Sequence, residues 1–155
     1  MDWANWKPKD YAVLCFIMDD DKVLLIEKRR GLGAGKINAP GGRIEPGETE
    51  VEAVIRETQE EVLITPIDPV FSGRLQFQFT DGYSLDCAVY RAESYTGTPG
   101  ETDEALPFWC AADTIPFDRM WQDDQLWIPH MLESREFWGC FVIDGDSMMW
   151  HYLDT

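Results

Sequence analysis

Apolar runs with the composition of β-strands recur along the chain. Residues 11–18 and 22–29 are apolar and are separated by a short acidic turn, which predicts a β-hairpin. Residues 74–80 alternate between apolar and polar with a period of two, so one face of that strand is expected to be buried. Further strands are predicted at residues 84–92, 106–111, 136–143 and 147–153, the last two joined as a hairpin.

Two segments carry helical signals. Thr49 and Glu52 have the spacing of a capping box at the start of a helix. The side chains that then share one helical face, and that we expect to contact the core, are those of Val51, Ile55, Thr58 and Val62. Residues 123–134 predict a second helix, which Pro129 must kink or shorten. Together these elements predict an α/β fold in which helices cover both faces of a mixed β-sheet.

Composition limits the class of protein. A length of 155 residues is enough for one domain with a sizeable core, and we expect residues 1–155 to form it. The N-terminus has no apolar signal-peptide core, and no apolar run reaches the roughly 18 residues that a membrane span needs. The four cysteines lie far apart without a CxxC pair, which disfavours a zinc site and is typical of a reduced, cytoplasmic protein.

The charge of the chain limits the kinds of partner that it can bind. It has 13 basic and 29 acidic residues, and the net charge of −16 is unfavourable for binding a nucleic-acid polymer. Six of the 13 basic residues lie in one segment, at Lys22, Lys28, Arg29, Arg30, Lys36 and Arg43. This cluster is either a solvated face or a binding site for a small anionic ligand. We expect a monomer that acts on a small molecule, with neither nucleic acid nor a membrane as partner.

Three glutamates share one turn of the first predicted helix. Glu57, Glu60 and Glu61 lie at i, i+3 and i+4, where each pair of like charges costs a few tenths of a kcal/mol or so in an isolated helix. One explanation is an exposed acidic face, which is common on surface helices. The other is a hard divalent cation such as Mg²⁺, which takes oxygen ligands and offsets the repulsion.

A longer pattern surrounds these glutamates and favours the cation. Gly41 and Gly42 allow a backbone atom to approach a ligand closely, and charged residues follow at fixed spacings in GGRIEPGETEVEAVIRETQEEVLI. This stretch resembles the Nudix box, and the matching positions are Gly42, Glu48, Arg56, Glu57, Glu60, Glu61 and Ile64. Two positions differ from the box. Thr58 replaces an aliphatic residue, and Leu63 replaces a glycine that commonly has a positive φ, which costs leucine about 1 kcal/mol or more.

The resemblance implies a Nudix fold and a Mg²⁺- or Mn²⁺-dependent hydrolase of nucleoside diphosphates linked to a further group. The metal ligands that it implies are Glu57, Glu60, Glu61 and the carbonyl oxygen of Gly41. Arg56 would hold Glu48 and orient the set. One glutamate would accept the proton of the attacking water, and both Glu57 and Glu61 are candidates for this base.

Segments outside the box resemble one subfamily. KRRGLGAGKINAPGG, TGTPGETDEALPFW and IPFDRMWQDDQLWIP are similar to the oxidised purine nucleoside triphosphatases, MutT homologues that remove 8-oxo-dGTP and 2-hydroxy-dATP from the nucleotide pool. With the box, the similarity covers most of residues 10–153. The substrate-binding residues that it implies are Asn38, Trp121, Asp123, Asp124, Lys28 and Leu32. It also implies that Glu104 is a further acidic residue of the metal site.

The chemistry of the implied purine pocket is consistent with its residue types. A guanine edge presents both donors and an acceptor, and two adjacent carboxyl groups in an apolar pocket need not both ionise. A protonated aspartate can then donate while its neighbour accepts, Trp121 can stack on the ring, and Asn38 can bond to the base edge. Each residue also has a structural explanation. Asp123 and Asp124 suit a helix N-terminus, Trp121 suits a core, and Asn38 suits a turn.

Some pocket positions depart from the animal enzymes of the subfamily. Pro40 and the glycines after it resemble bacterial MutT proteins, Leu32 replaces an aromatic residue, and Val13 replaces a threonine.

Two other functions are compatible with the sequence. One is a different Nudix activity, on ADP-ribose, dinucleoside polyphosphates or nucleotide sugars. ADP-ribose hydrolases usually have a proline about sixteen residues past the box, whereas this chain has none between Pro69 and Pro99. The other is a nucleotide-binding domain without turnover, which only the departures at Thr58 and Leu63 support.

Overall fold

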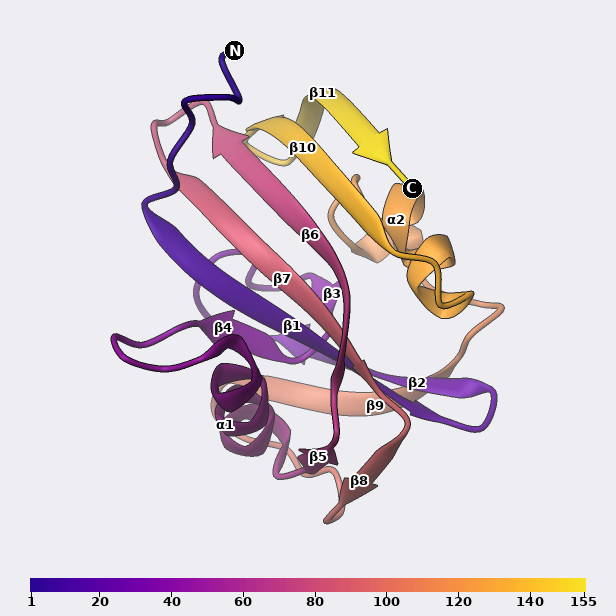
Figure 1. Ribbon diagram of the computed structural model, residues 1–155. Helices are drawn as coiled ribbons and strands as arrows, with labels where there is room; N and C mark the ends of the chain where they lie inside the picture. The colour runs from indigo at the N-terminus through magenta and orange to yellow at the C-terminus, as the bar shows by residue number, and fades with distance from the viewer.

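The computed structural model describes residues 1–155 as eleven strands, two α-helices and one 3₁₀-helix, η1 (Figure 1). The strands are β1 (Asp10–Asp19), β2 (Lys22–Lys28), β3 (Ile37–Asn38), β4 (Gly41–Arg43), β5 (Thr65–Ile67), β6 (Val70–Phe79), β7 (Ser84–Ala92), β8 (Ser94–Thr96), β9 (Ala105–Ala111), β10 (Phe137–Asp144) and β11 (Ser147–Asp154). The helices are α1 (Glu50–Val62), η1 (Phe117–Arg119) and α2 (Asp124–Leu132). All seven strands expected from the sequence are present, and the two hairpins are confirmed.

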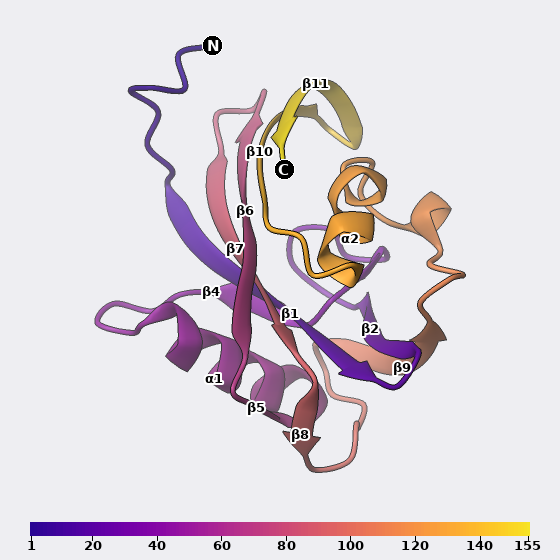
Figure 2. The same cartoon turned by 45° about the vertical axis from the view of Figure 1, so that its right-hand side comes forward.

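Nine of the strands form one mixed sheet. Its order is β11-β10-β6-β7-β1-β2-β3, with β4 also paired to β1 and β9 to β2. The β1–β7 and β6–β10 ladders are parallel, and the other ladders of this sheet are antiparallel. Figure 2 shows α1 and α2 on opposite sides of the sheet, which confirms the predicted α/β/α arrangement.

The sheet buries apolar side chains on both faces. One core of 17 residues includes Phe16, Trp127 and Phe141 and lies between the sheet and α2. The other, of 13 residues, includes Cys15 and Val54 and lies under α1. Successive residues of β1 therefore alternate between two cores, which explains why this strand is almost continuously apolar in sequence.

Strand β1 changes partners along its length and so positions the glycine loop. Residues 12–14 pair with β4, whereas residues 18–19 pair with β2. The close β1–β4 contact requires a glycine at position 41, because a Cβ there would overlap the carbonyl oxygen of Val13. Strand β4 is thereby held between β1 and α1, where the acidic turn of the helix faces it.

Helix α1 begins as predicted, but it buries a different face. The Thr49–Glu52 capping box is present, with Glu52 N–H donating to Thr49 Oγ1 at 3.1 Å and Thr49 N–H donating to Glu52 Oε1 at 3.0 Å. The predicted stripe was wrong in its first turn, since Val51 is 39% exposed and Ile55 is only partly buried. The buried residues are Ala53, Val54, Thr58, Glu61 and Val62. The helix is rotated so that Glu61 reaches β4, which the apolar pattern alone does not specify.

The two departures from the Nudix box are both accommodated. Thr58 is fully buried, and its hydroxyl donates to the carbonyl oxygen of Val54 at 2.7 Å, so the polar group is satisfied. Leu63 has φ of 66°, so the helix ends in the left-handed conformation without a glycine. The last carbonyls of the helix are also bonded, since Gly100 N–H donates to Val62 O and the Thr102 hydroxyl donates to Glu61 O.

Helix α2 is shorter than the predicted residues 123–134. It spans nine residues and keeps Pro129 inside it, and the chain turns out of the helix within one turn of the proline. Asp123 precedes the helix but its side chain makes no hydrogen bond to a helix N–H. Asp123 and Asp124 therefore lie at the N-terminus of α2, as their structural explanation expected, but Asp123 does not cap the helix through its side chain.

The state of the cysteines and the length of the helices match what the composition led us to expect. All four cysteines are free; Cys15, Cys87 and Cys140 are buried and Cys110 is partly buried. Neither helix has the length and apolar character needed to cross a membrane.

Candidate active site

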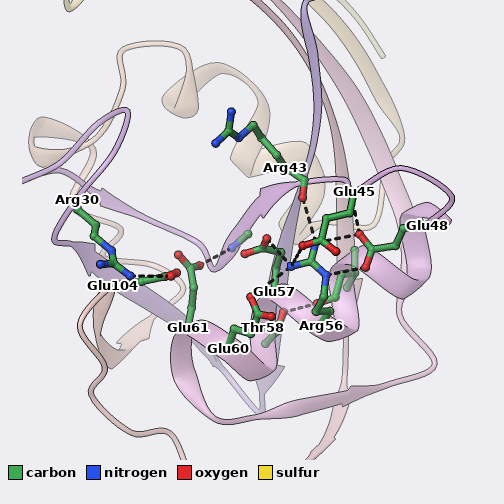
Figure 3. Close-up of polar contacts among 12 residues, drawn as sticks. Arg30, Arg43, Glu45, Glu48, Arg56, Glu57, Thr58, Glu60, Glu61 and Glu104 are labelled. Carbon is green, nitrogen blue, oxygen red and sulfur yellow. Dashed lines mark hydrogen bonds and ion pairs between the residues drawn. The ribbon is translucent and has the colours of Figure 1, made fainter.

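Arg56 is the centre of the polar network on α1 (Figure 3). Its Nε and Nη2 donate to the two carboxylate oxygens of Glu48 at 2.6 and 2.8 Å, a bidentate pair. Its Nη1 donates to Glu57 at 2.8 Å and to Glu60 at 3.2 Å, and its Nη2 also donates to the carbonyl oxygen of Arg43. The hydrogen bonds from Arg56 lower the pKa of Glu48 to about 2. The loop before α1 and the acidic turn are thus tied to one guanidinium.

Glu57 and Glu61 face β4 from successive turns of α1. The carboxylate of Glu57 lies against Gly42, where a Cβ would overlap it, so a larger residue at position 42 would displace this carboxylate. Glu61 is 4% exposed, and its Oε1 accepts from Gly41 N–H at 2.8 Å. Burial raises the pKa of both groups, that of Glu61 to about 7. The negative charge of Glu57 raises the pKa of Glu61 further, and that of Glu60 raises the pKa of Glu57. Glu57 is paired with Arg56, whereas Glu61 accepts only from a backbone N–H, so its negative charge is costly in this site.

Glu104 approaches the same cluster from the loop before β9. Its carboxylate accepts from Arg30 at 3.0 Å, and its negative charge raises the pKa of both Glu57 and Glu61. Figure 3 shows Glu104 and Glu61 on the same side of the acidic turn. No three acidic, histidine or cysteine side chains are grouped closely enough to hold a metal ion, and Arg56 and Arg30 pair with Glu57, Glu60 and Glu104.

The donor set nevertheless fits a hard divalent cation. Every candidate ligand is an oxygen atom, which is what Mg²⁺ prefers. The carboxylate of Glu61 is buried and that of Glu57 partly buried, and the pKa of both is raised by burial, so a cation placed between them would offset their negative charge. The space that Gly42 leaves for Glu57 shows that the backbone is shaped around this carboxylate.

One pocket joins this acidic cluster to the second set of predicted residues. It has a cavity volume of about 120 Å³, and most of its 21 lining residues are apolar. All six predicted substrate-binding residues line it, namely Lys28, Leu32, Asn38, Trp121, Asp123 and Asp124. Gly41, Gly42 and Glu61 line it as well. The structure therefore brings the expected base site and the edge of the expected metal site into one continuous space.

Asp123 and Asp124 are buried residues of the pocket lining. They are 1% and 3% exposed. Asp123 accepts a hydrogen bond from Trp127 Nε1 at 2.8 Å, whereas Oδ2 of Asp124 has no partner. Burial raises the pKa of Asp123 to about 6 and raises that of Asp124 as well, and the two carboxyls interact. At neutral pH the pair can therefore hold a proton and present both a donor and an acceptor.

Trp121 and Asn38 line the sides of the pocket. The Trp121 ring meets Phe79 edge-on at a centroid distance of 6.1 Å. Oδ1 of Asn38 accepts from Ala39 N–H at 2.8 Å, so its Nδ2 is left to donate to a ligand. Trp121 packs at the margin of the core, so its structural explanation holds in part. The explanation of Asn38 as a turn residue is wrong, because Asn38 lies in strand β3.

Sequence reasoning missed several residues of this pocket. Phe77 and Phe79 line it, although their alternation on β6 had indicated only a buried face. Trp127, which holds Asp123, was also missed. Lys36 was named only as one of the clustered basic residues, and its position over Trp121, just outside the pocket lining, was not expected. The spacing of Asp123 and Trp127 could have indicated their contact, because residues i and i+4 of a helix share a face.

The comparisons with known proteins identify the class of this fold and site. A protein-family model described as the NUDIX domain matches residues 8–131, so the chain belongs to the Nudix family. Nudix hydrolases generally use divalent metal ions.

Particular relatives are similar over nearly the whole chain. The chain is 42% identical to the zebrafish (Danio rerio) oxidized purine nucleoside triphosphate hydrolase over 91% of its length and 92% of that protein's. It is 35% identical to the mouse (Mus musculus) protein of the same name, over 90% and 91% of the two chains. The crystal structure of a MutT protein from Bacillus halodurans superposes with a TM-score of 0.84 at 28% identity, covering 94% and 97% of the two chains.

Proposed function

We propose that this protein hydrolyses oxidised purine nucleoside triphosphates, 8-oxo-dGTP first and 2-hydroxy-dATP second, to the monophosphate and pyrophosphate. The observation that carries the proposal is the single pocket that extends from the buried Asp123–Asp124 pair to Gly41 and Glu61. A base bound at the first end has its phosphates directed toward the second. The names of the zebrafish and mouse relatives support the same substrate class. The role is removal of damaged nucleotides before they enter DNA.

The purine is recognised by the carboxyl pair. With one proton between them, Asp123 and Asp124 offer one donor and one acceptor to the base edge. Trp121 stacks on the ring, and Nδ2 of Asn38 donates to an acceptor on the base. The apolar remainder of the pocket excludes water, which strengthens these hydrogen bonds.

The phosphates are held at the acidic turn. The residues that would hold Mg²⁺, or Mn²⁺ in its place, are Glu57, Glu60, Glu61, Glu104 and the carbonyl oxygen of Gly41. When bound, the ion neutralises phosphate oxygens and acidifies the attacking water. Lys28, which lines the pocket, pairs with a phosphate, and Arg56 keeps Glu48 and Glu57 in fixed positions. Glu57 or Glu61 accepts the proton of the water.

The molecule is proposed to act as one domain, as a monomer and in the cytoplasm. The main sheet draws strands from residues 10–154, which supports a single folding unit. The net charge of −16 disfavours nucleic-acid polymers and is compatible with a small anionic substrate bound at a local cation site.

A panel of about a dozen canonical and oxidised nucleotides tests the substrate class. We expect kcat/KM in the presence of Mg²⁺ to be highest for an oxidised purine triphosphate, with monophosphate and pyrophosphate as products. ADP-ribose, dinucleoside polyphosphates and nucleotide sugars belong in the same panel. A protein that leaves 8-oxo-dGTP uncut while hydrolysing one of these would have a different substrate.

The variant Glu60→Gln separates an enzyme from a silent nucleotide-binding domain. It should lower kcat for the preferred nucleotide by about 10²-fold or more while changing KM much less. Equal turnover by the parent and this variant would show that Glu60 takes no part in the reaction.

A further inference from the structure

Lys36 lies at the mouth of the pocket, on the far side of the Trp121 ring. Its Nζ is 5.0 Å from the ring centroid and 3.6 Å from Oδ2 of Asp146, in the turn between β10 and β11. Its backbone is fixed, because its N–H donates to Gly33 O at 2.9 Å and its carbonyl accepts from Lys28 N–H at 3.0 Å. The side chain therefore connects the glycine loop before β3 to a turn far along the chain.

Trp121 separates two hollows. One is the base pocket, and the other is a polar hollow lined by residues 31–36, 79–81 and 144–146, to which Lys36 belongs. With open space behind it, the indole needs contacts on the side away from the base to stay in place. Gly33 supplies one, since a Cβ there would lie 2.8 Å from Trp121 Nε1, and the Lys36 ammonium supplies another.

The charge of the same ammonium group also acts on Asp124 in the base pocket. The groups that face Asp124 are Asp123 beside it, the Cys87 thiol from β7 and Lys36 from the glycine loop, with Lys28 and Glu61 at the phosphate end. The positive charge of Lys36 lowers the pKa of Asp124 and so opposes the effect of burial. It therefore stabilises the ionised form of the carboxyl pair.

We propose that Lys36 is a positioning residue that determines base specificity: its ammonium group holds the Trp121 wall on the side away from the pocket lining. This inference rests on the proposed function, because it takes the pocket to be the purine site. Lys36 acts through Trp121 and Asp124 and stays outside the pocket lining. Its removal should loosen the stacking wall and leave the carboxyl pair protonated over a wider pH range, so discrimination between purines should weaken.

The test compares three variants. Lys36→Met keeps the aliphatic stem without the charge, and Lys36→Arg keeps a cation over the ring. Lys22→Met, at the exposed start of β2, removes the same charge elsewhere and is the matched control. For each protein, kcat and KM are measured for 8-oxo-dGTP and dGTP from pH 5 to 9. Binding of 8-oxo-dGMP without metal is followed by tryptophan fluorescence.

For Lys36→Met we expect a KM for 8-oxo-dGTP and a dissociation constant for 8-oxo-dGMP that rise about three- to fivefold, with kcat changed less than about twofold. The selectivity for 8-oxo-dGTP over dGTP should fall about threefold. The pH midpoint of kcat/KM should rise by about half a unit, since a carboxyl pair without the nearby cation releases its proton at higher pH. Lys36→Arg and Lys22→Met should stay within about twofold of the parent in every quantity.

Two results would overturn the inference. One is a Lys36→Met protein that matches Lys22→Met in KM, selectivity and pH midpoint. The other is a Lys36→Arg protein as impaired as Lys36→Met, which would leave the charge without a role. If the parent itself fails to hydrolyse 8-oxo-dGTP, it is the proposed function that fails. The same comparison is then made with the nucleotide of highest kcat/KM and its monophosphate, for which the same differences between variants are expected.

Discussion

Asp123 and Asp124 are carboxyls that the fold buries at a cost to its own stability. Burial raises the pKa of both, so each loses its proton more easily in the unfolded chain than in the folded one. As the pH rises from about 4, the unfolded state ionises first, and stability is lost progressively until the folded pair also ionises. For Asp123 this window ends at about pH 6. Oδ2 of Asp124 has no hydrogen-bond partner to offset the penalty.

Replacing Asp124 should therefore stabilise the substrate-free protein at neutral pH and above. Asp124→Asn cannot ionise, so we expect its free energy of unfolding in urea at pH 8 to exceed that of the parent by about 1–3 kcal/mol. The gain should shrink as the pH is lowered toward about 4, where the parent carboxyl is protonated in both states. The exposed Asp113→Asn is the control and should show no such pH dependence. A gain that is the same at both pH values would rule out ionisation as its cause.

For single residues, the contacts that could be predicted from the sequence are those between partners that lie close together along the chain. Glu48 and Arg56 belong to one short pattern, and the structure places them in a bidentate pair. The pocket residues Asn38 and Asp124 came from similarity to a family. Lys36 was named in the basic cluster, but its contacts with Trp121 and Asp146 were not expected, because neither residue is near it in sequence and a lysine in a glycine-rich loop has no periodicity to mark it.

At the scale of elements, α1 shows that an apolar pattern does not by itself determine which face of a helix is buried. Its start was predictable because Thr49 and Glu52 form a local capping box. Its buried face was not, because Thr58 and Val62 fit both the predicted stripe and the observed one. The bond from Gly41 N–H to Glu61 selects the observed rotation, and no local pattern contains a contact between a helix and a distant strand.

The end of α1 can be tested through backbone conformation. Leu63 has φ of 66° and a half-exposed side chain. Leu63→Gly and Leu63→Ala both remove that side chain, but only glycine adopts positive φ without strain. We expect the free energy of unfolding of Leu63→Gly to exceed that of Leu63→Ala by about 1 kcal/mol, measured by urea denaturation. Equal stability of the two variants would show that this residue carries no backbone strain.

At the scale of the whole molecule, the charge distribution lowers the stability of the folded state. The net charge of −16 makes the folded chain repel itself, and the acidic turn of α1 concentrates part of that charge around Glu57 and Glu61. Arg56 balances the outer carboxylates, whereas Glu61 is buried with only a backbone N–H as donor. Salt screens exposed charges over a Debye length of about 10 Å at 0.1 M, but it screens a buried carboxylate much less.

Monovalent salt and Mg²⁺ should therefore stabilise the protein by different amounts at equal ionic strength. We expect NaCl to raise the melting temperature modestly by screening, and MgCl₂ to raise it further by binding at the acidic turn. At about ten times the dissociation constant, bound Mg²⁺ contributes about 1.4 kcal/mol, or roughly 3–6 °C for a chain of this size. Glu61→Gln should lose this additional shift, whereas the exposed Glu136→Gln, which removes one negative charge elsewhere, should keep it. A full Mg²⁺ shift in Glu61→Gln would place the ion at another site and would remove Glu61 from the metal ligands.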